Sequence, residues 1–237
     1  MSMAPTDRGL RSLRRTNLRE EAVEVLRAAI LGGELEPGSI HSAVGLAQRL
    51  GVSPTPVREA MLELANSGLV EVLPNRGFRV TVIDDQDLDE ICELRMQLEV
   101  PAIGLVIDRA TNDGLEALYE PLNELEAAAR RSDVASFLLA DRRFHLELLG
   151  LAGNRRLVEI VEGLRDQTRI IGLRSLADTG ALQATAEEHR PILEALRARD
   201  AVAAKRLMTV HLEHTRGAWA GLAESPSTES PSVGSGE

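Results

Sequence analysis

The chain has 237 residues, of which 43% are hydrophobic and only 2% aromatic, and it carries one cysteine and a formal net charge of −10. This length can bury two modest cores of aliphatic side chains, whereas a single cysteine excludes a framework of disulfide bonds. No apolar run reaches the roughly 18 residues of a membrane-spanning helix, and no signal peptide is apparent, so we expect a cytoplasmic protein with no membrane partner.

The negative charge is unevenly distributed along the chain. Residues 1–82 contain ten arginines and nine acidic residues, whereas residues 83–237 contain 17 basic and 28 acidic residues. A nearly neutral N-terminal part can bind nucleic acid when its arginines share one face. Residues 1–16 hold four of these arginines, and we expect them to form a disordered basic arm. The alternative is a solvated tail that contacts nothing.

Two short helices joined by a tight turn are predicted near the N-terminus. Apolar side chains recur at helical spacing over residues 44–50, and Gly51 begins a three-residue break. A second helix starts at residues 53–56, where serine and threonine offer hydroxyl caps and two prolines suit a first turn. An amphipathic helix over residues 18–31 would cover both from behind. This order is typical of a helix-turn-helix, whose second helix enters the major groove of DNA.

A β-hairpin is predicted to follow the second helix. Residues 69–73 and 78–82 are expected to form its strands, and residues 74–77 the turn between them. The hairpin would be the wing of a winged helix-turn-helix, with a basic tip that touches phosphate or the minor groove. An alternative is a small helical module whose hairpin only completes the fold. The residues predicted to contact double-stranded operator DNA are Ser53, Thr55, Arg58, Asn75, Arg76 and Gly77.

This stretch resembles the N-terminal domain of the GntR family of bacterial transcription regulators. The resemblance rests on AILGGELEPG at residues 29–38, LA at 46–47, LGVS at 50–53, TPVREA at 55–60 and GLV at 68–70. It implies a DNA-binding domain, which we assign to residues 17–82. A single module of this kind reads too few base pairs for useful specificity, so we expect a homodimer on a palindromic operator.

The pattern changes after the hairpin, and residues 83–223 are predicted to form an all-helical effector-binding and dimerisation domain. The fold class is therefore mainly α, a winged helix-turn-helix followed by an antiparallel six-helix bundle. Pro101, Pro121 and Pro191 fall inside the helices and are expected to kink or split them. The polar residues 224–237 are expected to be a disordered tail. The six helices are predicted at residues 85–109, 114–131, 133–152, 155–177, 184–199 and 201–222.

Four of the five histidines lie in this helical part. Asp141 and His145 are four residues apart, so both side chains leave the same face of one helix. A carboxylate and an imidazole at this spacing can bind a divalent metal ion, and histidines of two later helices would complete the site. Taken singly, such residues are more often exposed or hydrogen-bonded than metal ligands.

The later histidines lie on the last two predicted helices. His189 follows a capping-box pattern that begins at Thr185, which would place it in the first turns of its helix. His211 comes three residues after Met208 on the predicted inner stripe of the last helix, and His214 lies one turn further.

These residues resemble the FCD effector domain of the FadR-like branch of the GntR family. The resemblance rests on the Asp-x-x-x-His pair at residues 141–145, Gly-Asn at 153–154, Glu-His at 188–189 and the Met-x-x-His pair at 208–211. In many FCD domains an aspartate and three histidines bind a divalent metal ion, such as zinc, nickel or manganese. The resemblance therefore implies the ligands Asp141, His145, His189 and His211, with His214 as the alternative to His211.

These features predict that the protein is a ligand-responsive transcription regulator and not an enzyme. Four protein ligands leave one or two positions of an octahedral ion for water or for the carboxylate of a small organic acid effector. Arg95 lies on the apolar stripe of the first bundle helix, where a charge must meet an anion. That anion is either the effector or a core carboxylate of the protein.

We expect this regulator to be a repressor that releases its operator when the effector binds at the metal ion, and two alternatives to this function remain. One is a metal-dependent hydrolase or oxygenase with an appended helix-turn-helix. The sequence shows no catalytic base at motif spacing, no nucleotide-binding glycine loop and no nucleophile elbow to favour it. The other is a regulator whose metal ion is purely structural.

Overall fold

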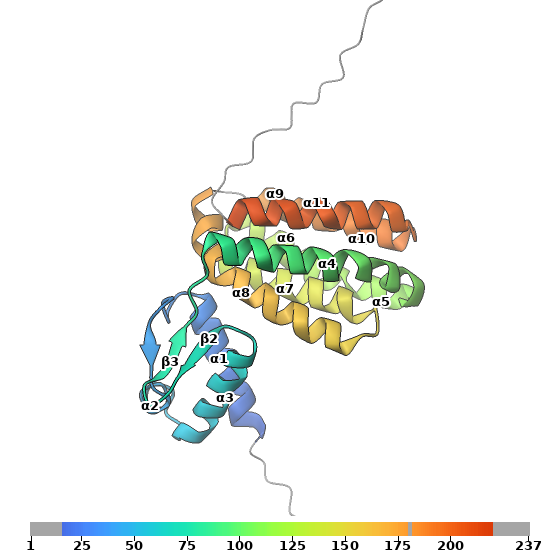
Figure 1. Ribbon diagram of the computed structural model, residues 1–237. Coiled ribbons are helices and arrows are strands. Elements are labelled where there is room, and N and C mark those ends of the chain that lie inside the picture. Colours follow the sequence, from blue (N-terminus) through green and yellow to red (C-terminus); the bar gives the residue numbers. More distant parts are fainter. Residues whose placement is uncertain (1–15, 180–181, 220–237) are drawn as a thin grey trace, which may run out of the picture. The chain divides into compact units, whose positions relative to one another are not determined.

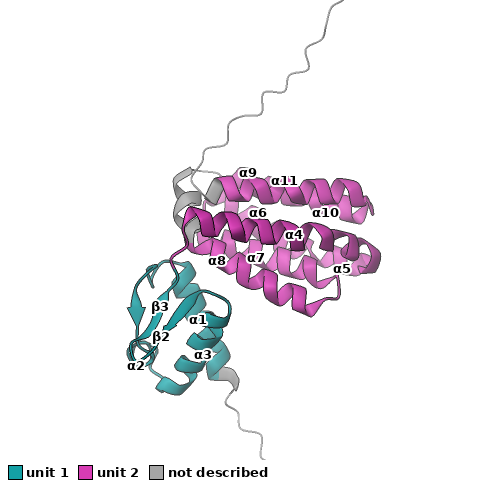
Figure 2. Ribbon diagram, viewed as in Figure 1, with its two compact units in different colours: residues 1–81 teal, residues 82–237 magenta. Residues whose placement is uncertain are grey.

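The computed structural model describes residues 16–179 and 182–219. The chain divides into two compact units, residues 1–81 and residues 82–237 (Figure 2). The predicted basic arm, apart from Thr16, and the predicted tail lie outside the described residues.

Three helices form most of the N-terminal unit: α1 (Thr16–Leu31), α2 (Ala43–Leu50) and α3 (Pro54–Asn66) (Figure 1). The hydroxyl of Ser42 accepts a backbone N–H from the first turn of α2, which fixes where this helix begins. Gly51 ends α2 with a φ of 68°, a left-handed conformation that glycine adopts without a steric cost. The predicted break between the two short helices is therefore confirmed.

A three-stranded antiparallel sheet completes this unit, with β1 (Ile40–His41), β3 (Gly77–Val80) and β2 (Val70–Leu73) in that order. The predicted hairpin is confirmed, but β1 was not predicted, because two residues are too few to show alternation. Gly77 has a φ of 113°, and a Cβ atom there would lie 2.3 Å from the carbonyl oxygen of His41. Close packing against β1 therefore requires glycine at this position.

The described part of the C-terminal unit is entirely helical, and eight helices occupy the six predicted segments (Figure 1). The helices are α4 (Asp85–Arg109), α5 (Asn112–Ala117), α6 (Tyr119–Arg130), α7 (Val134–Gly150), α8 (Arg155–Thr179), α9 (Leu182–Glu187), α10 (His189–Arg197) and α11 (Ala201–Trp219). No described helix is both long and apolar enough to cross a membrane.

Prolines account for the two additional helices. Pro121 is the third residue of α6 and Pro191 is the third residue of α10, so each lies in a first turn, where its missing N–H costs nothing. The predicted helices over residues 114–131 and 184–199 are split just before these positions. Pro101, in contrast, lies within α4 without ending it.

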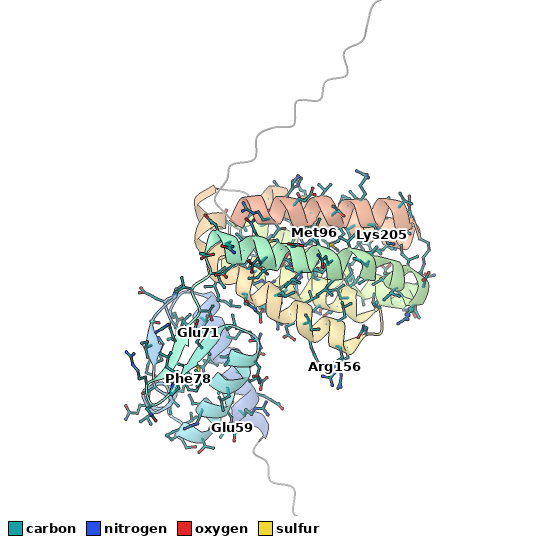
Figure 3. All side chains as sticks on the ribbon, in the orientation of Figure 1. Glu59, Glu71, Phe78, Met96, Arg156 and Lys205 are labelled. Carbon is teal, nitrogen blue, oxygen red and sulfur yellow. The ribbon has the colours of Figure 1, made fainter. Side chains whose placement is uncertain are left out.

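The core of the helical unit is built from aliphatic side chains, as the composition predicts. Met208 is fully buried, which confirms the inner stripe of α11, and Met96 of α4 packs at the margin of the same cluster (Figure 3). Charged and polar side chains of several helices are buried beside this core. They form the site described next.

Candidate functional site

The predicted reading residues lie on the surface of the N-terminal unit. Ser53 is the N-cap residue of α3, but its hydroxyl makes no capping hydrogen bond. The hydroxyl is exposed, as are Thr55 and Arg58 in the first turns of the helix. The opposite face of α3 is buried through Val57, Ala60, Met61 and Leu64. The helix therefore presents its polar N-terminal end to solvent, which is the geometry of a recognition helix.

The tip of the wing is also exposed. Asn75 adopts a φ of 60°, and both Asn75 and Arg76 are exposed in the turn between β2 and β3. Gly77 is half-buried beneath them, against β1. The wing therefore offers one amide and one guanidinium group, both of which bind phosphate and base edges.

All four predicted metal ligands come together in the helical unit. Asp141 and His145 of α7, His189 of α10 and His211 of α11 are buried, and one ligand atom of each lies within 4.8 Å of the others. The Nε2 atom of His145 lies 3.1 Å from Nε2 of His189 and 3.1 Å from Nε2 of His211. His214 is outside this cluster, with 46% of its side chain exposed.

The outer nitrogens of two imidazoles show which atoms face inward as acceptors. Nδ1 of His189 lies 2.9 Å from the carbonyl oxygen of Thr185, and Nδ1 of His211 lies 2.7 Å from a carboxylate oxygen of Glu188. These oxygens only accept, so each Nδ1 carries a proton, and the neutral form of each ring turns an Nε2 lone pair inward. Oδ1 of Asp141 lies 3.1 Å from Nε2 of His189. A group of converging acceptors fits a divalent cation.

The surroundings of Asp141, His145 and His211 favour the protonation states that a metal ion needs. Burial, followed by the charge of Arg165, lowers the pKa of His145 well below its ordinary value. Burial and the neighbouring His189 lower the pKa of His211 to about 4. Burial acts to raise the pKa of Asp141, but the neighbouring His189 and the surrounding positive charges hold it well below the ordinary value. Binding of a metal ion to these side chains would therefore release few protons.

A network of buried ion pairs supports the cluster. Arg95 donates from Nε to Glu99 at 2.8 Å, and Arg165 donates from its Nη2 to the other oxygen of Glu99 at 2.5 Å. Arg169 donates to Oδ2 of Asp141 at 2.7 Å. Asp141 therefore turns one oxygen towards the imidazoles and the other towards the arginines of α8.

Arg95 is buried and paired with Glu99, which is the internal ion pair that the sequence left open as the alternative to an effector contact. Sequence reasoning missed Glu99, Arg165 and Arg169. Glu99 follows Arg95 by four residues on the same helix, a spacing that could have revealed the pair. Arg165 and Arg169 are also four residues apart, but arginines on a helix are usually solvated, so their spacing gave no signal.

The predicted capping box at Thr185 is wrong. Leu182 and Ala186 are buried in the core, so α9 already begins at Leu182 and Thr185 lies inside it. Glu188 instead occupies the N-cap position of α10, without a side-chain capping bond, and His189 is the first residue of that helix. The break between α9 and α10 leaves the Thr185 carbonyl to accept from His189.

The metal-free protein is expected to lose stability as the pH falls from 7 to about 4. His211 has a pKa of about 4 in the fold and about 6.5 in an unfolded chain, so the unfolded chain binds the proton first. Stability is therefore fully present above the unfolded value and falls until the folded value is reached. A shift of this size corresponds to roughly 3 kcal/mol.

Urea unfolding of the chelated protein at several pH values measures this loss. His211→Gln should flatten the dependence of the unfolding free energy on pH, whereas the same change at the exposed His214 should leave it close to wild type. Equal pH dependence in the wild type and in His211→Gln would contradict the prediction.

A winged helix-turn-helix with an exposed second helix, followed by a helical unit that buries four side chains able to hold a metal ion, defines the class of DNA-binding transcription regulators. Residues 18–80 match the gntR family of bacterial regulatory proteins, and residues 90–214 match the FCD domain. The chain belongs to the GntR family and carries a C-terminal FCD domain.

Similar proteins agree with this assignment. The chain is 30% identical over 190 residues to the uncharacterized HTH-type transcriptional regulator YdhC of Bacillus subtilis, covering 80% of this chain and 85% of the relative. It is 32% identical over 203 residues to a probable D-xylose utilization operon transcriptional repressor of Paenarthrobacter nicotinovorans, covering 84% and 88%. The solved structure of E. coli McbR/YncC has a TM-score of 0.77 at 28% identity, over 86% of this chain and 97% of that chain. The protein is a transcription regulator and not an enzyme.

Proposed function

We propose that this regulator is a repressor whose affinity for its operator is lowered by a small organic acid bound at a divalent metal ion. The observation that carries the proposal is the convergence of three imidazole nitrogens and one carboxylate oxygen, all buried, within 4.8 Å. When bound, a zinc, nickel or manganese ion would neutralise these acceptors and leave positions open to a carboxylate oxygen. The relative from Paenarthrobacter nicotinovorans is named a repressor, which supports repression here.

The residues of this chain would divide the work as follows. Asp141, His145, His189 and His211 hold the ion, and Arg169 keeps the free oxygen of Asp141 turned away from it. Arg95 belongs to the proposal as a guanidinium that an effector carboxylate would share with Glu99. Because the ligands come from α7, α10 and α11, occupancy of the site would favour one arrangement of these helices over others.

A homodimer would convert that preference into a change of DNA affinity. The DNA-binding units of the two copies must match two half-sites of the operator that lie about one helical turn apart. A helical domain that joins the two copies sets the distance between these units, so a population shift in that domain changes how well both units fit.

The metal content of the purified protein tests the first half of the proposal. We expect close to one equivalent of divalent metal per chain in the wild type and much less in His145→Ala, because a buried ligand is lost and a cavity replaces it. His214→Ala is the matched control and should retain the metal. Chelation should lower the melting temperature of the wild type, because the ion stabilises only the folded state. Equal metal content in wild type and His145→Ala would refute the assignment of the site.

Operator binding in the presence of carboxylic acids tests the second half. Fluorescence anisotropy of a labelled operator, titrated with small mono- and dicarboxylic acids, should reveal an acid that releases the DNA from the metal-loaded protein. The same acid should raise the melting temperature only when metal is present. If chelation lowers the melting temperature but no acid alters melting or DNA affinity, the ion is structural and the effector proposal fails.

A further inference from the structure

Glu188 directly precedes α10 in the chain, and its side chain contacts two histidines of α11. Its Oε2 atom accepts from Nδ1 of His211 at 2.7 Å, and its Oε1 atom lies 2.5 Å from Nδ1 of His214. The side chain of Glu188 is 21% exposed, and its contact with the buried His211 is more shielded from water than its contact with the exposed His214. Glu188 occupies the N-cap position of α10 but makes no capping bond, because both of its oxygens are directed to α11.

The three imidazoles of the cluster differ in what holds their outer nitrogen. His189 donates to a backbone carbonyl, that of Thr185. Nδ1 of His145 lies 3.9 Å from the nearest oxygen of Glu99, which is beyond hydrogen-bond distance. Of the three, only His211 has a carboxylate in direct contact with its outer nitrogen.

A carboxylate at this position changes the imidazole as a ligand. It fixes the tautomer, so that Nε2 carries the lone pair, and it fixes the orientation of the ring. It also raises the basicity of the ring and therefore its strength as a donor to a metal ion. Partners of this kind commonly change metal affinity by about 10–100-fold when they are removed.

The local fold explains why Glu188 can reach α11. The chain breaks between α9 and α10, and His189 begins α10 directly after this break. His189 points into the cluster and makes its outer hydrogen bond to α9, whereas the residue before it points to α11. Two consecutive residues therefore serve the same site, one as a ligand and the other as a support for a ligand on another helix.

We propose that Glu188 is the positioning residue of the metal centre: by bridging His211 and His214, it holds Nε2 of His211 towards the other ligands and sets the affinity for metal. This inference rests on the proposed metal site. It also makes Glu188 the point at which α11 is joined to the start of α10, so that metal affinity depends on how α11 is docked.

Glu188→Gln tests the proposal, with Glu187→Gln as the matched control. Glu187 is exposed and accepts a hydrogen bond from Gln183 within α9, so its replacement removes the same charge one residue away without touching the cluster. Competition between the protein and a chelator for Co²⁺ should show that Glu188→Gln binds the ion 10–100-fold more weakly than wild type. Glu187→Gln should bind as wild type does, and all three metal-free proteins should melt at similar temperatures.

The tautomer of His211 provides a further readout, because it would not change on replacement of Glu188 if Glu188 only stabilised the fold. In ¹⁵N spectra of the metal-free wild type, the proton should reside on Nδ1 of His211, whereas Glu188→Ala should show a mixture of tautomers. His214→Ala should weaken Co²⁺ binding less than Glu188→Gln, because the bond between Glu188 and His211 remains.

The possible outcomes separate the inference from the function on which it rests. Wild-type affinity in Glu188→Gln, or an unchanged tautomer in Glu188→Ala, overturns the positioning role while the metal site stands. A lower melting temperature of metal-free Glu188→Gln with unchanged affinity would show that Glu188 serves the fold alone, which also overturns it. A wild-type protein that binds no Co²⁺ overturns the metal site itself.

Discussion

Arg58→Ala is expected to abolish specific operator binding at concentrations where the wild type is saturated, while the fold stays intact. Arg58 is exposed in the first turns of α3, and other residues form the buried face of this helix. A bidentate contact from arginine to a base is worth about 1–3 kcal/mol of discrimination. In a dimer that uses two reading heads the free-energy loss is doubled, which is roughly 30-fold at the least and far more at the upper end.

Arg156→Ala is the control for this change. Arg156 is an arginine of α8 whose side chain is 77% exposed and projects from the helical unit (Figure 3), so its loss removes the same charge from the other unit. Fluorescence anisotropy with operator DNA and with unrelated DNA measures the loss of specific binding. Thermal melting of the same variants shows whether the protein still folds. Operator affinity that is unchanged in Arg58→Ala would remove α3 from the role of recognition helix.

Arg165→Met is expected to destabilise the metal-free protein by about 3–5 kcal/mol, because it leaves an uncompensated buried charge. The side chain of Arg165 is 2% exposed, and it lies between Glu99 and Asp141. Burial lowers its pKa to about 10, so it remains protonated at neutral pH. Methionine fills much of the volume, but it leaves two buried arginines, Arg95 and Arg169, against three buried carboxylates, those of Glu99, Asp141 and Asp166.

Arg155→Met provides the comparison on the same helix. The side chain of Arg155 is 81% exposed and lies 3.5 Å from Glu159, so its removal should change the unfolding free energy by about 0.5 kcal/mol or less. Urea unfolding of the two variants and the wild type measures the difference. Similar stabilities for Arg155→Met and Arg165→Met would mean that the buried network does little for the fold.

Local signals carried the prediction of the fold. Gly51 and the prolines near residue 54 marked the helix-turn-helix, and helical periodicity marked six segments of the second unit. The two-residue strand β1 escaped detection, because its position depends on pairing with β3, nearly forty residues later. Thr185 was misread for a related reason, since burial of Leu182 in a distant core extended α9 upstream of the apparent cap.

The ligands of the candidate metal centre were named from the sequence with the help of a family resemblance, and the structure brings all four together. Their supports were not foreseen, because each lies on a different helix from the ligand it contacts. Arg169 meets Asp141 across 28 residues, and Glu188 meets His211 across 23. Spacing along the chain reveals partners on one helix, whereas these contacts exist only after the helices have packed.

The short strand β1 gives the DNA-binding unit a mechanical property. It pairs with β3 of the wing, and the chain leaves it directly into Ser42, the cap of α2. The wing is thereby tied to the helix that precedes the recognition helix, and Gly77 is packed against that connection. The tip of the wing and the recognition helix should therefore move as one rigid body. A conformational change that reaches this unit would therefore shift the whole unit on the DNA, and the arrangement of the wing relative to the recognition helix would stay the same.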